Sequence, residues 1–417
     1  MNPRDDVLVI GGGVIGVACA YYLSKEGLRV RLLEKDRIGS GASHANCGLI
    51  SPSHALPLAT PGVIGKGLRW LLRKDSPLYI KARFDPALMM WLARFALRCN
   101  DRDMRASIDA LCPILSGSRA LYERLFQEES MACEWSPSGS LSVFRTEKEM
   151  AAFAPTVELL KARGIVAVAL TDAALREKEP AVRDDMFGGW YFKIDAHLRP
   201  DRLMAEWRRI LLERGVAVEE DCAVHSLDVS GGSVRSAGTA RGRFAADHFV
   251  LAAGAWSPRL ARRLGVKLPI QPAKGYSVTM GRPARCPRMP VFFQETKVLA
   301  TPWPSGFRLG GTMEFSGFDP AKSSIRISAL HRAAAEYLHD PGNGPAGEEW
   351  AGWRPMTWDS LPVIDRAPRL SNLTVAAGHN MLGMSLAPAT GKLVAELLAG
   401  RDPHLPLAPY ALRRFAA

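Results

Sequence analysis

Three glycines near the N-terminus, Gly11, Gly13 and Gly16, have the G-x-G-x-x-G spacing of a turn that holds a dinucleotide phosphate. The apolar run at 7–10 predicts a buried parallel strand before them, and 14–26 predicts a helix after them. Gly11 would allow the tight turn, Gly13 would let the backbone approach a pyrophosphate, and Gly16 would let the helix pack on the strand. The helix N-terminus would supply free N–H groups to the anion, so we expect a dinucleotide site here.

An acidic residue follows at the distance that such a site requires. The next predicted strand, at 29–33, ends at Glu34. A carboxylate there accepts hydrogen bonds from both ribose hydroxyls and repels a 2′-phosphate. A purely structural glycine turn is the alternative, but it explains neither the preceding strand nor the acid.

The same apolar stretch, 7–23, has a second interpretation as a signal-peptide core or a short membrane span. It follows Asp5 and Asp6 rather than a basic region, and no cleavage pattern follows it. We therefore reject both interpretations. No other stretch of the sequence is long enough to span a bilayer.

Three later segments carry residues that a bound cofactor or substrate would meet. The strand-like run at 250–257 ends in small residues, and 378–384 is a glycine-rich entry to a final helix. The segment 353–362 places one cation, Arg354, among aromatic and apolar residues. The alternatives are an ordinary buried strand, a glycine-rich helix entry and a buried structural salt bridge.

Composition narrows the class of protein. The chain has 54 Lys and Arg against 42 Asp and Glu, a net charge of +12, and 47% hydrophobic with 23% charged residues is globular composition, which excludes a disordered, collagenous or coiled-coil chain. The seven cysteines are scattered and never spaced C-x-x-C, so we expect no disulfide framework and no zinc or iron–sulfur site. A reducing compartment fits best.

The predicted elements mix helices with strands throughout. Residues 56–132 favour helices, 198–215 favours an amphipathic helix, and 267–317 favours short strands. A last helix is expected at about 388–399, with Pro388 in its first turn and glycine just past its end. The fold class is therefore α/β with an α+β insertion.

Five short motifs in this order resemble one family over nearly the whole chain. It is the family of flavin-dependent amino acid oxidoreductases that includes D-amino acid oxidase, glycine oxidase and sarcosine oxidase. The chain is most similar within it to the bacterial D-amino acid dehydrogenases of the small-subunit type. The motifs are A-N-C-G-L-I-S-P at 45–52, A-T-P-G at 59–62, K-G-Y-S at 274–277, R-P-M-T at 354–357 and G-H at 378–379.

The resemblance implies a Rossmann-type FAD-binding domain interwoven with an α+β substrate-binding domain built on a mostly antiparallel sheet. The FAD-binding domain is expected at 1–55, 197–265 and 351–417. The substrate-binding domain is expected at 56–196 and 266–350.

The resemblance also implies which residues hold FAD. They are Gly11, Gly13, Val14, Ile15, Gly16, Glu34, Lys35, Ser43, Asn46, Gly48, Leu49, Val224, Ala253, Gly254, Trp256, Gly378, Leu382, Gly383 and Met384. The covalent members of the family attach flavin through a histidine or cysteine. His44 stands one position away from that histidine, where this chain has Ala45, and Cys47 is expected to be a small buried loop residue. We therefore expect non-covalent FAD.

Arg354 matches the arginine that binds the substrate carboxylate in relatives, a task that suits the guanidinium fork. With the substrate so held, hydride transfer from Cα to flavin N5 needs no protein base once the amine is neutral. The N-terminus of the last helix is expected to stabilise the negative charge of the reduced flavin. Tyr276, His54 and His379 are secondary pocket candidates, although His54 equally suits a loop cap and His379 a residue that orients the glycine turn.

Half of the net charge lies in the segment 56–100, which has eight basic and two acidic residues. Its basic residues alternate with large apolar ones, and Leu88, Trp91, Leu92 and Phe95 share one helix face. Peripheral contact with anionic membrane on the cytoplasmic side of the inner membrane, with electron delivery to quinone, is one hypothesis. The alternative is that this apolar face is core and the charges are solvated.

The sequence thus predicts an FAD-dependent dehydrogenase that converts D-amino acids to 2-oxo acids and ammonium. A dehydrogenase of a cyclic imino acid, such as D-proline or D-hydroxyproline, is the near alternative, and the motifs do not separate the two. A flavin-dependent tRNA-modifying enzyme and a flavin subunit of a heteromeric dehydrogenase are more distant ones. No methyltransferase-like domain or basic tail is present, so we expect no nucleic-acid partner.

Overall fold

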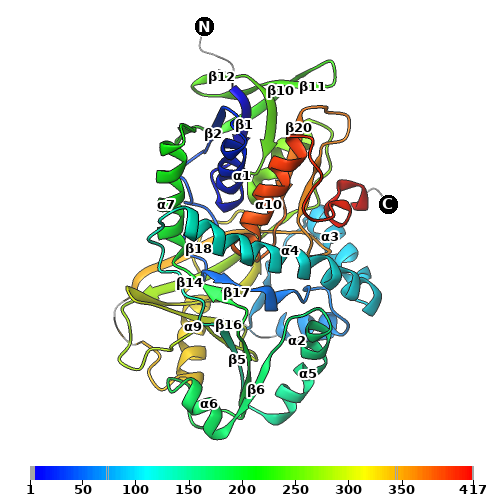
Figure 1. Cartoon of the computed structure of the whole chain (residues 1–417). Helices are drawn as coiled ribbons and strands as arrows, with labels where there is room; N and C mark the ends of the chain where they lie inside the picture. Colours follow the sequence, from blue (N-terminus) through cyan, green and yellow to red (C-terminus); the bar gives the residue numbers. More distant parts are fainter. Residues whose placement is uncertain (1–4, 72, 74, 343, 345, 416–417) are drawn as a thin grey trace.

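Two large sheets organise the chain. The structure, a computed structural model, describes residues 5–71, 73, 75–342, 344 and 346–415. Figure 1 shows the sheet of β1 and β20 with α1 and α10 in the upper half, the sheet of β14, β17 and β5 in the lower half, and α4 crossing between them. This arrangement confirms the α/β class with interwoven sheets.

The upper sheet has six strands in the order β19-β20-β13-β1-β2-β9. All neighbours run parallel except β19 and β20. Because β1 lies between β13 and β2, the loops after β1 and β13 open a crevice at the carboxyl end of the sheet, where dinucleotides bind in such folds. The bounds are β1 (Asp5–Ile10), β2 (Val30–Leu33), β9 (Ala217–Glu219), β13 (Ala246–Leu251), β19 (Val363–Arg366) and β20 (Leu373–Ala377).

Helices α1 (Val14–Lys25) and α10 (Gly383–Leu398) are the pair that packs most closely beside this sheet. The approach is close because both are rich in small residues: a Cβ at Gly391 of α10 would lie 2.5 Å from the Ala18 carbonyl oxygen of α1. The neighbouring elements are α7 (Pro200–Glu213), η2 (Gly254–Trp256), α8 (Ser257–Arg263) and a small sheet of β10 (Val224–Ser230), β11 (Ser233–Thr239) and β12 (Gly242–Phe244). The chain ends in η3 (Ala408–Tyr410) and η4 (Leu412–Phe415).

Helix α10 begins at Gly383, so the predicted start at Pro388 is wrong. Proline lacks an N–H group and normally ends a helix, because the carbonyl four residues before it loses its partner. Here that carbonyl belongs to Met384, and the hydroxyl of Tyr122 donates to it at 2.7 Å. Tyr122 is fully buried on α4. A side chain from another helix therefore replaces the missing hydrogen bond, and the helix extends toward the crevice.

The lower sheet has nine strands and is mostly antiparallel, as expected. Only the β5–β15 and β4–β17 pairs are parallel. Along the order β18-β14-β17-β16-β15-β5-β7-β6, with β4 beside β17, the bounds are β18 (Ala346–Met356), β14 (Gln271–Met280), β17 (Gly306–Phe315), β16 (Val298–Trp303), β15 (Val291–Phe293), β5 (Ser140–Phe144), β7 (Gly188–Phe192), β6 (Val168–Thr171) and β4 (Leu78–Ile80). Helix α9 (Ser324–Tyr337) packs on β14, β16 and β17, and α5 (Glu147–Lys161) and α6 (Asp172–Lys178) flank β5 to β7.

Strand β18 crosses the predicted domain boundary. The boundary at 350/351 falls inside β18, whose residues as far as Met356 pair with β14. Residues 351–356 therefore belong to the lower sheet, because the strand continues until Met356 pairs with Gln271. The division into an FAD-binding and a substrate-binding domain stays a prediction.

The region 56–132 is largely helical, with α2 (Val63–Leu71), α3 (Pro86–Leu97) and α4 (Asp101–Glu128). The apolar face of α3 proposed for a membrane is packed instead: Leu88 and Trp91 are buried, and the Trp91 indole donates to the Met356 carbonyl oxygen at 3.1 Å. Leu92 and Phe95 pack against the same core. Leu72 and Lys74 of the predicted basic segment lie outside the described residues.

The segment 43–50 joins the two sheets. Ser277 of β14 donates to the Ala45 carbonyl oxygen at 2.6 Å, and Arg308 of β17 donates to that of Asn46 at 2.7 Å. Beyond them, β3 (Leu49–Ile50) pairs with β8 (Ala196–His197), and η1 (Pro52–His54) follows. The segment predicted to wrap a flavin is therefore fixed from the lower sheet.

We predict that Tyr122→Phe lowers the free energy of unfolding by about 1–3 kcal/mol, because it leaves the Met384 carbonyl buried without a donor. Denaturant unfolding measures this change. The matched control is Tyr79→Phe at an exposed tyrosine of β4, for which we expect a change within about 0.5 kcal/mol. Equal effects of the two substitutions would contradict the proposed role of the hydroxyl.

Candidate active site

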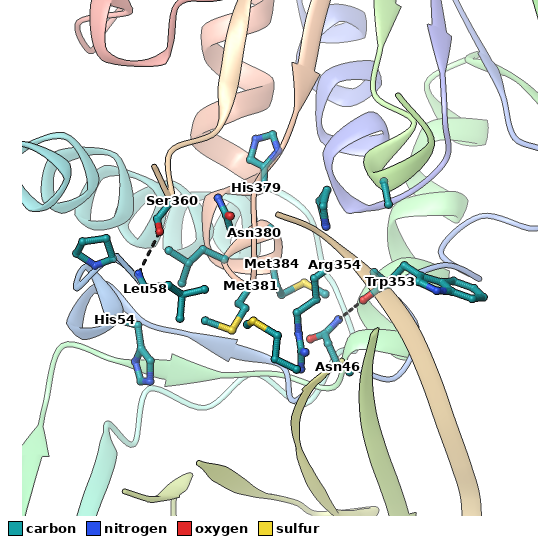
Figure 2. A pocket seen from close by; sticks show the side chains of 18 of the residues that line it. Asn46, His54, Leu58, Trp353, Arg354, Ser360, His379, Asn380, Met381 and Met384 are labelled. Atoms are coloured by element: carbon teal, nitrogen blue, oxygen red, sulfur yellow. Dashed lines mark hydrogen bonds between the residues drawn. The ribbon is translucent and has the colours of Figure 1, made fainter. Parts of the chain in front are cut away.

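One cavity of about 1990 Å³ lies between the carboxyl end of the upper sheet and the lower sheet. Figure 2 shows the side chains of Arg354, Asn46, His54 and Met384 meeting at this pocket from four separate segments. The structure brings nearly all of the predicted site residues to its wall. Only Gly16 and Gly378 of the predicted cofactor residues do not line it.

The glycine turn has the geometry that the sequence predicts. Gly11 has a φ of +109°, and a Cβ there would lie 2.6 Å from the carbonyl oxygen of Ala252, the residue that follows β13. A Cβ at Gly16 would overlap the Gly11 carbonyl, so Gly16 serves the packing of α1 on β1 and not the cavity wall. The turn is thus open toward the cavity at Gly13, the N-cap residue of α1, which has no side chain.

Glu34 lies at the end of β2 with its carboxylate oriented by the backbone. The Gly12 N–H donates to Oε2 at 2.6 Å and the Asp36 N–H donates to Oε1 at 3.0 Å. Burial raises the pKa of Glu34, and these two hydrogen bonds oppose the shift. Each oxygen has a second lone pair free, which suits a pair of ribose hydroxyls.

The loop after β2 is held in place by its own side chains. Ser43 Oγ accepts from the Val14 N–H at 2.9 Å, which links the loop to the start of α1. Asn46 accepts from the Gly48 N–H at 2.9 Å and donates to the Ala42 carbonyl oxygen at 3.2 Å. The predicted flavin-binding loop is therefore preorganised.

On the adenine side of the predicted site, Lys35 and Trp256 meet in a cation–π contact, with the ammonium 4.7 Å from the ring centre. Trp256 also packs edge-to-face on Trp353. Val224, Ala253 and Gly254 complete this part of the wall.

The turn 378–382 carries the start of α10 into the cavity. Asn380 has a φ of +53°, and its side chain accepts from the Thr357 N–H at 2.9 Å and donates to the Gly378 carbonyl oxygen at 2.9 Å. Helix α10 then starts at Gly383 with no side-chain cap on Leu382. Its positive end and free N–H groups therefore face the cavity, where they favour negative charge.

Arg354 is the cation at the centre of the lower wall. Its guanidinium lies over Gly275 of β14, where any Cβ would overlap it, and donates to the Thr312 carbonyl oxygen of β17 at 2.6 Å. No carboxylate of the described ranges pairs with it, and burial lowers the pKa of Arg354. Guanidinium remains protonated in such surroundings, so this is a buried positive charge that faces an open cavity.

Tyr276 lines the cavity but does not direct its hydroxyl toward Arg354. Successive side chains of a strand point to opposite faces, and Arg354 lies on the face of Gly275. The Tyr276 hydroxyl donates to Glu314 at 2.8 Å, and Glu314 also pairs with the buried Lys274 at 3.0 Å. Tyr276 therefore belongs to a polar cluster on the face of the sheet opposite to Arg354.

The two histidines predicted for the site, His54 and His379, are both neutral at neutral pH. Burial lowers the pKa of His379 to about 3, and its Nε2 bonds the Thr390 hydroxyl of α10 at 3.0 Å, which agrees with the role of orienting the glycine turn. Burial and Lys297 lower the pKa of His54 to about 4. His54 Nδ1 lies 3.2 Å from Ser53 Oγ, and Ser53 bonds the buried Asp195.

The two residues considered for covalent attachment differ in position. His44 pairs with Glu348 at 2.8 Å and lines a separate small pocket. Cys47 lines the large cavity, and burial raises the pKa of its thiol. Within the described ranges, all seven cysteines are free and no group of three His, Cys, Asp or Glu side chains has a metal-binding arrangement.

Several residues of the site gave no usable signal in the sequence. Asn380 follows a glycine in a turn, a position that favours asparagine at positive φ, so local chemistry could have indicated it. Gln294 and Lys297 line the cavity from the β15–β16 turn, and neither belongs to a motif. The pairing of distant strands brings them to the cavity that Arg354 also lines.

The Rossmann-type sheet, the glycine turn with Glu34 and the cavity between two sheets define a dinucleotide-dependent oxidoreductase. A model of the FAD-dependent oxidoreductase family matches residues 6–397. The chain therefore belongs to this family, and its cofactor is FAD. The turn, the oriented carboxylate and the uncapped helix start fit that cofactor.

Similar proteins and solved structures are consistent with this family. The chain is 35% identical over 422 residues to D-amino acid dehydrogenase of Methylobacterium radiotolerans, covering 99% of this chain and 100% of that protein. Glycine oxidase from Geobacillus kaustophilus superposes with a TM-score of 0.79 at 26% identity over 98% of both chains. L-proline dehydrogenase from P. horikoshii has a TM-score of 0.77 at 21% identity over 100% of this chain and 99% of that one, and shares the fold.

We predict that Gly275→Ala displaces the Arg354 guanidinium, because the new methyl group would occupy its place. The purified variant should keep its FAD absorbance while the affinity for a carboxylate ligand, read from perturbation of the flavin spectrum, falls about tenfold or more. Gly281→Ala, at a glycine with open space around it, is the control. Unchanged affinity in Gly275→Ala would show that Arg354 has room to move aside.

Proposed function

We propose that this chain is an FAD-dependent dehydrogenase that oxidises D-amino acids to 2-oxo acids and ammonium, with a quinone as electron acceptor. The single observation that carries the choice of substrate class is Arg354, a buried cation without a carboxylate partner in the described ranges. The carboxylate of an amino acid substrate would supply the missing partner of Arg354. The named dehydrogenase relatives support the D-configuration and the use of an acceptor other than oxygen.

Arg354 fixes one end of the substrate. Its Nη1 donates to the Thr312 carbonyl oxygen at 2.6 Å and its Nη2 to that of Gly311 at 3.5 Å, and the N–H groups not used in these contacts are available to a carboxylate in the cavity. Because β14 and β17 support the guanidinium from beneath, the substrate carboxylate would be held in one orientation, which lowers the entropic part of the barrier. We assign neither Tyr276 nor His54 the role of removing a proton from the substrate amine. The amine would therefore lose this proton before or during binding.

Non-covalently bound FAD supplies the acceptor for the hydride that leaves Cα with its two electrons. The chain contributes the start of α10, whose positive end stabilises negative charge that develops in the cavity. The product is an imine, and water then adds to its carbon and releases ammonium and the 2-oxo acid.

A substrate screen tests the proposal. The purified yellow protein is offered D- and L-amino acids and D-proline with a quinone-like dye, in air and without air. We expect dye reduction with D-amino acids and no peroxide. Preference for L-amino acids, or for D-proline over all primary D-amino acids, would refute the proposed substrate class, and the second result would establish the imino acid alternative.

We predict that Arg354→Met lowers kcat/KM by about 100-fold or more through KM, because both hydrogen bonds to the carboxylate are lost. Arg354→Lys should recover part of this loss, since lysine keeps the charge without the fork. FAD content, read at the flavin absorbance, should stay equal in both variants. Normal turnover of Arg354→Met would exclude this residue as the carboxylate ligand.

The proposal includes peripheral contact with anionic lipid on the cytoplasmic side of the inner membrane. The face first considered is packed, but the outer face of α3 exposes Met90 and Leu97 by 59% and 71%, with Arg94 between them. Phe84, just before α3, is 88% exposed. Helix α2 exposes Leu68 beside the basic residues Lys66 and Arg69, and Leu68 lines the cavity mouth. These mixed surfaces suit a headgroup layer.

No helix in the described ranges is both long enough and apolar enough to cross a bilayer.

We predict that the protein floats with phosphatidylglycerol vesicles and that Phe84→Ser combined with Met90→Ser reduces the bound fraction several-fold, because apolar area inserted into the interface is lost. Leu212→Ser on α7, an exposed apolar position away from α2 and α3, should leave binding unchanged. Absence of wild-type flotation at low salt would refute membrane contact without affecting the substrate proposal.

A further inference from the structure

Lys297 is a further cation that lines the same cavity as Arg354. Lys297 lies in the turn between β15 and β16 with a φ of +57°, a left-handed conformation that disfavours side chains other than those of Gly, Asn and Asp. Its side chain lines the cavity and is exposed there. The turn therefore holds a lysine at a position where the backbone would favour glycine.

The Lys297 ammonium is held by polar and aromatic neighbours. It donates to Gln294 Oε1 at 3.0 Å, and Gln294 Nε2 in turn donates to Ser142 Oγ at 3.1 Å. The ammonium also stands 5.7 Å from the ring centre of Phe292. The chain from Ser142 through Gln294 fixes the amide so that its oxygen faces the lysine, which leaves further N–H groups of the ammonium for a ligand.

Positive charge gathers at this end of the cavity. Lys66 of α2 lines the same cavity. Burial is the largest cause that lowers the pKa of Lys297, to about 8, and the charge of Lys66 is the second largest. Glu295 and Glu149 oppose that shift more weakly, and Glu295 is engaged elsewhere, by the Arg145 N–H and the Tyr337 hydroxyl. Within the described residues neither lysine forms an ion pair with a carboxylate. Two like charges that face one space favour an anion between them.

Lys297 and Arg354 reach β17 from its two sides. Arg354 donates to the carbonyl oxygen of Thr312, and a Cβ on the preceding residue, Gly311, would lie 3.0 Å from the Lys297 carbonyl oxygen. Neighbouring strands are about 4.8 Å apart. Both residues thus contact one short stretch of β17 from opposite sides and line the same cavity, so we expect a ligand with two anionic groups joined by a short chain to reach both cations.

We propose that Lys297, oriented by Gln294 and assisted by Lys66, binds the side-chain carboxylate of an acidic D-amino acid whose α-carboxylate is held by Arg354. This inference rests on the proposed function and specifies its substrate class. A neutral side chain would leave the lysine charge without an ionic partner in the cavity, whereas a carboxylate forms a charge-assisted hydrogen bond with it. His54 is neutral and adds no competing charge.

The test compares substrates of equal size and different charge. For the wild type we expect D-glutamate and D-aspartate to exceed D-glutamine and D-asparagine in kcat/KM by about tenfold or more. Lys297→Met should abolish that ratio while kcat/KM for D-glutamine changes less than about twofold. Lys148→Met, which removes an exposed charge on α5 outside the cavity, should leave the ratio unchanged. Equal ratios in wild type and Lys297→Met would overturn the proposal.

A binding measurement separates this proposal from the proposed function. Glutarate and valerate differ by one carboxylate, and perturbation of the flavin spectrum reports their affinities without turnover. The wild type should bind glutarate more tightly, and Lys297→Met should remove the difference. That result would support the subsite even if no D-amino acid were oxidised. Lack of a preference for glutarate in the wild type overturns the subsite, and this holds whether or not Lys297→Met retains FAD.

Discussion

A guanidinium that lies across a strand is the constraint on which the site depends. Arg354 belongs to β18, yet its contacts are with β17, two strands away in the sheet. It crosses β14 because Gly275 has no side chain. The same strands hold the 43–50 segment through Ser277 and Arg308. The register of three strands thus fixes both the substrate cation and the loop that meets the cofactor.

Local chemistry explains why the cofactor site was the part best predicted from the sequence. The strand, glycine turn, helix and Glu34 lie within the first 34 residues and interact with one another, so their spacing carries the whole geometry. The start of α10 is the opposite case. Pro388 predicts a helix start, but Tyr122, far away in sequence, supplies the missing hydrogen bond and lets the helix begin five residues earlier.

The substrate side was predicted less well, because side-chain direction depends on strand pairing. Tyr276 belongs to a recognised motif, but alternation along β14 directs its hydroxyl to Glu314. The face of α3 that contains Trp91 is amphipathic in sequence, and only the packed structure shows that it is core. Lys297 has no local pattern at all. It reaches the cavity because β16 pairs with β17, and no short motif encodes that pairing.

The order of strands in the upper sheet has a consequence for the synthesis of the chain. β1 pairs with β2 at once, but its other neighbour, β13, is formed by residues 246–251, and β13 in turn waits for β20 at 373–377. A nascent chain leaving the ribosome therefore carries β1 with one apolar edge unpaired during most of translation. Contacts this distant in sequence close slowly, and exposed strand edges promote aggregation. The strand order that creates a crevice for FAD thus leaves the upper sheet incomplete until residues 373–377 have been synthesised.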